Sequence, residues 1–389
     1  MRKFNLKVLL LLSAGHCMTD IYQGALPAAL PFLKDKLGLT YTSVGFILVA
    51  SNLASSVVQP LFGYFSDRKK KPLLLPLGCL FAGVGFSLLS LPSGFVPTIA
   101  LVLLSGLGIA AYHPEGFKTA SYFTGEKVAT GMSIFSVGGN LGFALGPIAS
   151  LFILKHYGIA VLPAMIVPAI TFVILIVFFW KSIAIPERVA TAQKTGQAKS
   201  QRSAYISLAL IISAVIMRSW TQFGLITYIP FYYIDYLKGD AFYAGKLVTA
   251  FLLSGVLGTL IGARLADQWG HKQFLIVSFA LSSMVLPLIF VAKGLALFAV
   301  LGALGFVLIS SFAVTMAMSQ RLLPNNIGMA SGLTVGFAIG TGGIGVTLLG
   351  TIADAYGVPA ALKLITILPV IGFIICLFVK YPSVYDGKQ

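Results

Sequence analysis

The sequence predicts an all-α membrane protein with twelve transmembrane helices arranged as two pseudo-symmetric six-helix bundles. Of its 389 residues, 58% are hydrophobic and only 10% are charged, whereas a soluble domain is about 25% charged. The apolar residues form long continuous runs instead of short alternating strands, which excludes a transmembrane β-barrel. The two halves of the chain also repeat each other. These observations exclude soluble, disordered and nucleic-acid-binding proteins.

The first bundle is predicted over residues 1–180. Its first apolar run starts behind Arg2, Lys3 and Lys7, as in a signal peptide, but it continues to Phe32 and is therefore predicted to be a retained span. The other runs are separated by short polar connections, and each is long enough to cross a bilayer. The predicted spans are 6–33, 41–62, 73–91, 97–117, 128–152 and 160–180.

A polar segment, residues 181–203, separates these six spans from the next six. It contains five basic residues and is predicted to be a cytoplasmic linker. The second bundle is predicted over residues 204–389 by the same reasoning. Its predicted spans are 204–234, 242–264, 273–292, 294–318, 327–350 and 359–380.

The distribution of positive charge predicts the orientation. The formal net charge is +16, from 27 Lys and Arg against 11 Asp and Glu. With both termini in the cytoplasm, 19 of the basic residues lie in cytoplasmic segments and seven on the opposite side. Because short cytoplasmic loops are enriched in Lys and Arg, we predict a multi-pass protein of the bacterial cytoplasmic membrane with both termini cytoplasmic. The charge is thus a topology signal and not a nucleic-acid-binding surface.

The two halves share residues at a nearly constant spacing. Gln, Asp, Pro and Gly residues of the first half recur 194 to 200 positions later in the same order. A carrier built from two such halves holds its substrate near the membrane midplane, between them. The recurring sets are Gln23, Leu26, Pro31 and Phe32 with Gln222, Leu225, Pro230 and Phe231; Gly45, Ala50 and Asp67 with Gly245, Ala250 and Asp267; and Gly138, Gly142 and Gly146 with Gly332, Gly336 and Gly340.

Asp67 and Asp267 follow the second and eighth predicted spans on the cytoplasmic side. The first stands in Gly63-Tyr-Phe-Ser-Asp67-Arg68-Lys-Lys-Lys71, which resembles the loop signature of the major facilitator superfamily, Gly-x-x-x-Asp-Arg-x-Gly-Arg-Lys. A carboxylate beside basic residues at a helix end can pair with charges or helix dipoles in one conformation only. We therefore predict gating roles for Asp67, Arg68 and Asp267. The alternative is a positive-inside cluster with a helix-ending Asp.

Gly138, Gly142 and Gly146 stand four residues apart and are followed by Pro147. Glycines at this spacing leave a smooth stripe that lets another helix approach closely. The stretch resembles the fifth-span signature of the drug–proton antiporter branch of the same superfamily, Gly-x-x-x-Gly-Pro. We predict that these four residues pack their span tightly against a neighbouring helix.

A polar stripe runs along the first span. His16, Asp20 and Gln23 lie at positions i, i+4 and i+7, so they share one helix face. A carboxylate that faces lipid is costly, and ionisable groups within spans are mostly functional. We therefore predict that the stripe faces an interior cavity, that Asp20 and His16 carry protons, and that Gln23 contacts substrate. The alternative is that neighbouring groups satisfy the His and the Asp in packing.

Arg218 is the only Arg well inside a predicted span. Its repeat equivalent is Thr19, beside Asp20, so we expect Arg218 and Asp20 to face each other across the cavity. A guanidinium offers fixed donors that suit carboxylate, phosphate or phosphonate groups. Arg218 and Gln222 are therefore predicted to bind substrate, with a structural ion pair between Arg218 and Asp20 as the alternative.

The fourth predicted span ends in His-Pro-Glu-Gly-Phe-Lys, residues 113–118. Glu115 and Lys118 are three residues apart and can pair. We predict either a gate salt bridge at the cytoplasmic mouth or a proton relay through His113 and Glu115. Tyrosines in spans are commonly interface anchors or packing residues, but some line cavities. Further candidate substrate contacts are Tyr22, Asn140 and Tyr228.

Four motifs of the first half combine into a more specific pattern. They are His16-x-x-x-Asp20-x-x-Gln23, Gln59-Pro60-x-x-Gly63-Tyr64, His113-Pro114-Glu115-Gly116 and Val137-Gly138-Gly139-Asn140-x-Gly142. With them the chain resembles the fosmidomycin-resistance family of the major facilitator superfamily. The resemblance implies the major facilitator fold and a proton-driven exporter with twelve spans.

We predict a monomeric carrier, not an enzyme, that exports a small anionic or zwitterionic organic compound or drug in exchange for protons. No Gly-x-x-x-x-Gly-Lys-Ser/Thr motif occurs, which disfavours ATP-driven pumping, and no cofactor or metal is predicted. The predicted partners are the substrate, protons and the lipid bilayer. Proton-coupled uptake of a metabolite is the main alternative, because fold and carboxylates do not set direction. A membrane sensor or scaffold is a poorer fit, since it has no need to bury Asp20 and Arg218.

Overall fold

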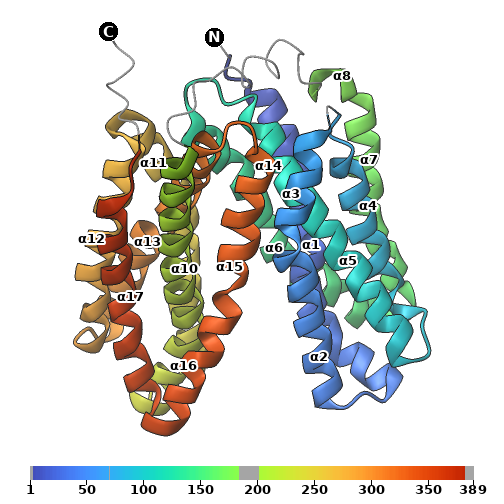
Figure 1. The fold of residues 1–389 in the computed structure, drawn as a ribbon. Coiled ribbons are helices and arrows are strands. Elements are labelled where there is room, and N and C mark those ends of the chain that lie inside the picture. Colours follow the sequence, from blue (N-terminus) through green and yellow to red (C-terminus); the bar gives the residue numbers. More distant parts are fainter. Residues whose placement is uncertain (1–2, 70, 184–200, 382–389) are drawn as a thin grey trace. The chain divides into compact units, whose positions relative to one another are not determined.

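The computed structural model describes residues 3–69, 71–183 and 201–381. Within these ranges every regular element is a helix, and the only β-type pairing is an isolated bridge between Phe4 and Thr124. All twelve ranges predicted as spans are helical (Figure 1). The predicted all-α fold class is therefore confirmed. Most of the predicted linker, residues 184–200, lies outside the described ranges.

Several spans of the first half consist of consecutive helical segments. The second span contains a π-helix, an irregularity that is frequent at functional sites. The elements are α1 Leu6–Leu37; α2 Tyr41–Asn52, the π-helix η1 Leu53–Val57 and α3 Gln59–Arg68; α4 Leu74–Ser87 and the 3₁₀-helix η2 Leu88–Ser90; α5 Phe95–Ser121; α6 Val128–Tyr157; and the 3₁₀-helix η3 Ile159–Ile166, α7 Val167–Phe178 and α8 Trp180–Ile183.

The second half follows the same plan, and its eleventh span contains another π-helix. The elements are α10 Gln201–Phe231 and the π-helix η4 Tyr232–Tyr236; α11 Ala241–Trp269; α12 His271–Val285 and the 3₁₀-helix η5 Leu286–Phe290; α13 Gly294–Leu322; α14 Ile327–Ser331, the π-helix η6 Gly332–Phe337, α15 Ala338–Gly340 and α16 Gly342–Tyr356; and α17 Val358–Phe378.

In the described ranges, ten helices are long and apolar enough to cross a membrane, and Leu74–Ser90 is a shorter apolar helix. α1 has 32 residues, which at about 1.5 Å per residue exceeds a hydrocarbon core of about 30 Å. Its middle, however, carries His16, Asp20 and Gln23. Polar groups within a span indicate that this face of α1 is turned away from lipid.

The chain divides into two compact units. Each unit contains most of one sequence half together with the start of a helix from the other half. Unit 1 consists of Met1–Glu126, Ile134–Gly196 and Pro324–Phe337, and unit 2 consists of Lys127–Ser133, Gln197–Leu323 and Ala338–Gln389.

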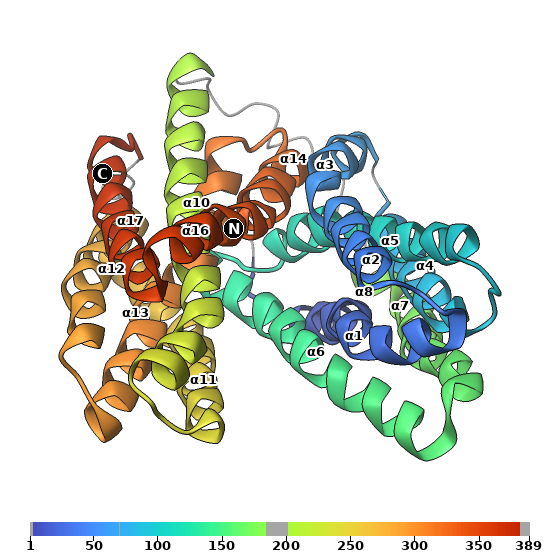
Figure 2. The same ribbon diagram turned by 90° about the horizontal axis from the view of Figure 1, so that it is seen from below.

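α5 forms the centre of unit 1. It packs against α1, α2, α3 and α4 (Figure 2), and every residue from Gly108 to Ser121 is buried. The close contact with α4 depends on glycine, because a Cβ at Gly78 or Gly108 would meet the backbone of the other helix. The polar end of α5 therefore lies in the protein interior instead of at a solvated face.

α13 has the corresponding place in unit 2. It packs along α11, and glycines again permit the contact, because a Cβ at Gly258 would meet the carbonyl of Phe306 and one at Gly305 would meet that of Phe251. α10 and α17 complete an apolar core that includes Leu225 and Leu362. This core supports α10, the helix that carries Arg218.

Candidate functional site

Three ionisable side chains meet in the interior of unit 1. Oδ1 of Asp20 lies 3.0 Å from Nε2 of His113, and Oδ2 of Asp20 lies 3.3 Å from Nε2 of His16. His16 and Asp20 are one turn apart on α1 and share a face, whereas His113 comes from α5. Each of the three residues is at most 8% exposed. We call this group the His–Asp–His cluster. Sequence reasoning linked His16 with Asp20 but did not foresee the contact with His113.

The proton on His113 follows from the donors around it. The amide nitrogen of Gln59 donates to the carbonyl of Ser55 at 2.7 Å and lies 3.1 Å from Nδ1 of His113. An amide nitrogen only donates, so Nδ1 of His113 accepts and its Nε2 carries the hydrogen that is donated to Asp20. Gln59 was not among the predicted site residues, although a Gln within an apolar span is itself a signal.

The proton on His16 is assigned in the same way. Its Nδ1 lies 2.9 Å from the carbonyl of Phe135, and because a carbonyl only accepts, Nδ1 donates. Nε2 then faces Oδ2 of Asp20. Nε2 and Oδ2 both have lone pairs that face each other at 3.3 Å, so a further proton would fit between these two atoms. The geometry of the cluster thus offers a place for one exchangeable proton, on the side of His16.

Aromatic rings and a glycine enclose this proton. The ring of Phe135 stacks on His16 with a centroid separation of 4.3 Å, and Phe117 meets His16 edge-on at 5.8 Å. Gly139 of α6 borders the cluster, and a Cβ at this position would contact both His16 and Asp20. An enclosed site of this kind strengthens charge interactions because the local dielectric is low.

The ligand-type atoms of the cluster lie within 4.8 Å of one another, close enough to share a cation. Binding a metal would require a lone pair on Nε2 of His113. The Gln59 amide occupies the lone pair of Nδ1 instead, which leaves Nε2 protonated. The donor set therefore fits a proton better than a metal ion.

Glu115 and Lys118 lie at the buried end of α5, where they are 1% and 4% exposed. Nζ of Lys118 is 3.7 Å from Oε1 of Glu115. It also donates to the carbonyl of Ser66 and, at 3.2 Å and 3.4 Å, lies near Oγ of Ser66 and the carbonyl of Lys69. Lys118 thus satisfies carbonyls at the C-terminal end of α3, while Oε2 of Glu115 has no hydrogen-bond partner within the described part of the chain.

Asp67 caps a helix that starts far away in the sequence. Its carboxylate accepts hydrogen bonds from the backbone N–H groups of Gly328 at 2.8 Å and Met329 at 2.9 Å. These groups belong to the first turn of α14, where a negative charge is stabilised by the helix dipole. The neighbouring Arg68 is exposed and places its guanidinium carbon 3.3 Å from the ring centroid of Tyr64.

Asp267 caps a helix in the same manner in unit 2. It accepts from the N–H groups of Ala129 at 3.0 Å and Thr130 at 2.9 Å, in the first turn of α6. Nε2 of His271 lies 3.0 Å from the same carboxylate, and Nδ1 of His271 lies 3.1 Å from the hydroxyl of Tyr381. Burial raises the pKa of Tyr381, so this hydroxyl keeps its proton and can donate to His271.

The glycine stripe of α6 lies directly on the backbone of α1. A Cβ at Gly138, Gly142 or Gly146 would meet the carbonyl of Ser13, Cys17 or Ile21, respectively. Successive turns of α6 are therefore in contact with successive turns of α1. Any larger side chain on this stripe must push the two helices apart.

Arg218 is 2% exposed on α10 of unit 2. Its Nη1 donates to Oε1 of Gln222 at 3.2 Å, and its guanidinium carbon lies 5.3 Å from the ring centroid of Phe312. Nε and Nη2 have no hydrogen-bond partner among the described residues. These two nitrogens form one edge of the guanidinium, the edge that binds both oxygens of a carboxylate or phosphonate.

The remaining predicted substrate contacts differ in their surroundings. The hydroxyl of Tyr22 donates to the carbonyl of Met165 at 3.0 Å and accepts from the N–H of Ala169 at 2.9 Å. The hydroxyl of Tyr228 donates to the carbonyl of Val346 at 2.8 Å. Both tyrosines thus join helices of their own unit, and we leave them out of the proposed binding site. Gln23 and Gln222 are half-buried and Asn140 is exposed.

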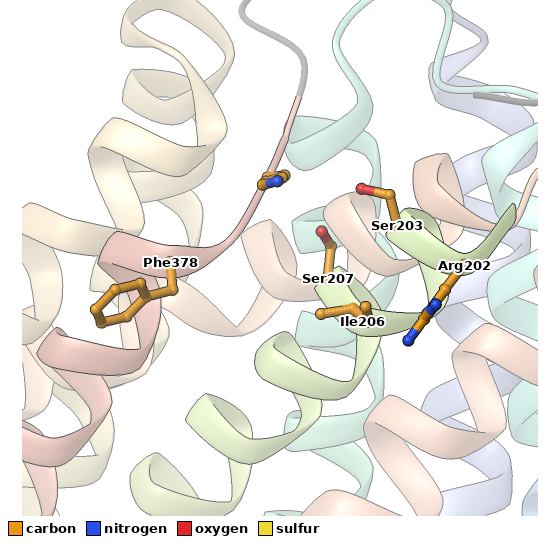
Figure 3. Close-up of a pocket in the computed structure, with 6 residues that line it drawn as sticks. Arg202, Ser203, Ile206, Ser207 and Phe378 are labelled. Carbon is orange, nitrogen blue, oxygen red and sulfur yellow. The ribbon is translucent and has the colours of Figure 1, made fainter. Parts of the chain in front are cut away.

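None of the predicted site residues lines the pocket shown in Figure 3. This pocket of about 190 Å³ lies in unit 2, between the start of α10 and the end of α17. Its basic side chains stand beside apolar ones at the ends of two spans, an arrangement that positive-inside segments commonly show. It is lined by Arg202, Ser203, Ile206, Ser207, Phe378 and Lys380.

Comparison with known proteins identifies relatives along nearly the whole chain. A family model described as Major Facilitator Superfamily matches residues 12–245 and 211–388. The chain is 34% identical over 378 residues to the MFS-type transporter YfnC of Bacillus subtilis (strain 168), covering 94% of this chain and 91% of that protein. It is 30% identical over 376 residues to the fosmidomycin resistance protein of Escherichia coli (strain K12), covering 93% and 90%. It is 26% identical over 314 residues to the multidrug resistance protein MdtG of Escherichia coli (strain 55989 / EAEC), covering 76% and 74%.

Solved structures show the same fold. The E. coli fucose:proton symporter FucP matches with a TM-score of 0.72 at 15% identity, covering 97% of this chain and 99% of that chain. The human organic anion transporter MFSD10 matches with a TM-score of 0.72 at 16% identity, covering 95% and 98%. At this level of identity the likeness concerns the fold alone.

Proposed function

Because the chain belongs to the major facilitator superfamily, a family of membrane transporters, we propose that it exports a small anionic or zwitterionic organic compound by proton antiport. The observation that carries this proposal is the His–Asp–His cluster, an enclosed carboxylate that two imidazoles contact inside the protein. Relatives named for fosmidomycin and multidrug resistance support export of a drug or similar compound.

The cluster supports proton coupling because it has two states that differ by one proton. With the proton present, His16 and Asp20 share it and every polar atom of the pair is satisfied. Without the proton, the lone pair of His16 faces a carboxylate oxygen of Asp20 at 3.3 Å. The deprotonated cluster therefore attracts a cationic or hydrogen-bond-donating group. A substrate that supplies this group competes with the proton, and such competition is the condition for antiport.

Arg218 supports an anionic group on the substrate. A buried guanidinium without a counter-charge is costly, and two of its nitrogens lack partners among the described residues. A carboxylate, phosphate or phosphonate satisfies both nitrogens at once. The proposed substrate thus carries an anionic group of the kind that suits Arg218 and a donor group of the kind that suits the deprotonated cluster. Gln222 holds the guanidinium in place, and Gln23 and Asn140 are proposed as further polar contacts.

Contacts within each unit support the predicted topology. In unit 1, the N–H of Asn5 donates to the carbonyl of Phe123 at 2.9 Å, and Lys118 reaches Lys69, so three predicted cytoplasmic segments meet at one end. In unit 2, Lys272 donates to the carbonyl of Leu377 at 3.0 Å. We propose a monomer in the bacterial cytoplasmic membrane with both termini in the cytoplasm.

Uptake by symport is the second candidate, and charge logic favours it. An anionic substrate binds more readily when Asp20 is neutral, so substrate and proton would then bind together. Antiport requires the opposite linkage. We side with antiport because the deprotonated cluster can hold a donor group and because the relatives named above are resistance proteins.

Transport in proteoliposomes with an imposed pH gradient tests the proposal. The probes are fosmidomycin and a panel of organic carboxylates and phosphonates. In vesicles that are acidic inside, antiport predicts accumulation of the substrate as protons leave. Accumulation only in vesicles that are alkaline inside would establish symport. Binding measured at several pH values gives an independent check, because affinity that strengthens with protonation would overturn the antiport proposal.

A further inference from the structure

Gln59 connects the His–Asp–His cluster to the segment Pro324–Phe337 of the same unit. We propose that Gln59 is a positioning residue with two effects. It fixes the tautomer of His113, and it couples any further proton, one that binds His113 itself, to the helix that begins at Ile327. The inference rests on the proposed function only in naming the proton shared by His16 and Asp20 as the one whose movement is coupled to transport.

The orientation of the Gln59 amide is determined by its surroundings. Gln59 is 3% exposed and directly follows the π-helix η1 and Val58. Pro60 has no N–H to give to the preceding turn, and the carbonyl of Ser55 accepts from the side chain of Gln59 at 2.7 Å. If the amide were turned over, two oxygens would face each other at that distance. The amide nitrogen therefore remains between Ser55 and His113.

This orientation selects one tautomer of His113. The amide nitrogen lies 3.1 Å from Nδ1 of His113, which must accept. Nε2 therefore carries the hydrogen and donates to Oδ1 of Asp20 at 3.0 Å. Oδ1 of Asp20 then always accepts a hydrogen bond from His113, and the exchangeable proton is confined to the side of His16. Without Gln59, the other tautomer would present a bare Nε2 to the carboxylate and draw the proton to Oδ1.

The opposite face of Gln59 packs on two glycines of η6. A Cβ at Gly332 would meet the carbonyl of Gln59, and a Cβ at Gly336 would meet its side chain. Gln59 therefore has no free space on the side of this segment. Its Oε1 is buried and has no hydrogen-bond partner among the residues that the structure describes, so in this part of the chain only the nitrogen holds the side chain. The same segment begins with the turn that Asp67 caps.

Protonation of His113 would break this arrangement. A second hydrogen, on Nδ1, would oppose the hydrogens of the Gln59 amide at 3.1 Å. Gln59 would have to present Oε1 to His113, and the bond to Ser55 would be lost. Because Gln59 is in contact with Gly332 and Gly336, loss of the bond to Ser55 would loosen the support that Gln59 gives to the segment Pro324–Phe337. In this way a proton that binds His113 itself, and not the one shared by His16 and Asp20, changes the contacts of Gln59 at this helix start.

Other titratable groups stand near the cluster, so the test must report on His113 itself. They are His16 and Cys17 on α1, Cys79 on α4, and Tyr112 on α5, all of which interact with Asp20. Nitrogen NMR on protein labelled at its histidines distinguishes the two imidazole tautomers directly. Its signals are assigned by comparison with His113→Gln.

Three forms of the full-length protein are compared in detergent micelles. The wild type should show the Nε2–H tautomer of His113 at neutral pH, and Gln59→Leu should show a mixture. Gln59→Glu has the same shape as the wild type and replaces the donor by an acceptor, so it should give a doubly protonated His113 even if the Leu variant does not fold. A wild-type His113 with its hydrogen on Nδ1, or an unchanged tautomer in both variants, would overturn the inference.

Hydrogen exchange tests the link to the helix start. After correction for intrinsic rates, protection of residues 327–337 should change with pH in the wild type and lose this dependence in Gln59→Glu. Asn52→Leu is the matched control, because Asn52 is an exposed amide of the same span and should leave the dependence intact. The pH midpoint of transport should rise by about one unit in Gln59→Leu, since Asp20 loses an oriented donor. An inactive protein with the expected tautomer would refute the proposed function and not this inference.

Discussion

Nε2 of His113 lies 3.0 Å from the carboxylate of Asp20, although 93 residues separate them in the sequence. The contact joins α5, the buried centre of unit 1, to α1. A proton that neutralises the carboxylate therefore changes the attraction between these two helices. A movement that separates α1 from α5 must likewise change the affinity for the proton. Binding of the proton and conformation are linked through this single pair.

Replacing Asp20 by Asn tests whether this carboxylate is the proton carrier. Asn has nearly the same shape but cannot ionise, so the exchangeable proton of the cluster is lost. Transport driven by a pH gradient should fall to background, while exchange of substrate across the membrane continues. His156→Gln is the matched control, because His156 is exposed and bonds the carbonyl of Phe152 in its own helix. Undiminished gradient-driven transport in Asp20→Asn would show that another group carries the proton.

Much of the fold could be predicted from the sequence, because each span corresponds to a continuous apolar run that is visible locally. The stripe of His16 and Asp20 was predictable for the same reason, since helical periodicity places both residues on one face. The contact of Asp20 with His113 was not predictable in this way. It depends on how α1 and α5 pack, and on residues far away in the chain such as Gly139 of α6, which leaves room for His16 and Asp20.

Two tyrosines illustrate the same limit. From the sequence, Tyr22 and Tyr228 look like cavity-lining residues because their phenol groups lie within spans. In the structure their hydroxyls bond the backbone carbonyls of Met165 and Val346. Whether a buried hydroxyl is available to a ligand depends on such backbone partners, which no local pattern records.

Arg218 provides the second test, through the geometry of its unpaired edge. Arg218→Ala should abolish substrate binding. Arg218→Lys keeps the charge but loses the two-point contact, so affinity should fall about 10- to 100-fold, as expected when a bond to a charged group worth about 1.5–3 kcal/mol is lost. Calorimetric titration of the variants with the identified substrate measures the change. Arg264→Lys, at an exposed position, should bind normally, and equal affinity in Arg218→Lys would contradict bidentate recognition.

Asp67→Asn tests the helix cap at α14. The variant keeps one acceptor oxygen but loses the charge that the helix dipole stabilises, a difference of about 1 kcal/mol. Turnover should slow about fivefold, while equilibrium affinity for substrate stays the same. Asp240→Asn is the control, because Asp240 caps α11 at an exposed position, 2.7 Å from the N–H of Tyr243. Lost binding with normal exchange rates in Asp67→Asn would argue against gating.

Glu115 and Lys118 allow a test by single and double substitution. Lys118→Met removes the donor for the carbonyls of Ser66 and Lys69 and leaves Glu115 as an unpaired buried charge. Breaking a buried pair in this way costs about 3–5 kcal/mol of unfolding free energy. The double variant Lys118→Met/Glu115→Gln should recover part of this loss, whereas Lys155→Met at an exposed position should cost little. Denaturation in detergent micelles measures all of these variants, and a double variant no more stable than Lys118→Met would show that the pair is not coupled.

The glycine stripe of α6 allows a test that distinguishes the steric effect of an added Cβ from the effect of helix propensity. At Gly142 a Cβ meets the backbone carbonyl of Cys17, whereas at Gly45 in α2 a Cβ meets no described atom within 4 Å. Both positions are helical, so Ala is favoured over Gly at each by its helix propensity, by about 1 kcal/mol. Gly45→Ala should therefore stabilise the protein. Gly142→Ala should destabilise it by about 1–3 kcal/mol, because the backbone of α1 cannot move aside as a flexible side chain does.

Gly142→Leu should disrupt folding or lock one conformation, as the larger side chain separates α6 from α1 and opens the enclosure around His16 and Asp20. Thermal unfolding and transport in proteoliposomes report the two effects. Normal expression, stability and transport in Gly142→Leu would refute close packing of α6 on α1.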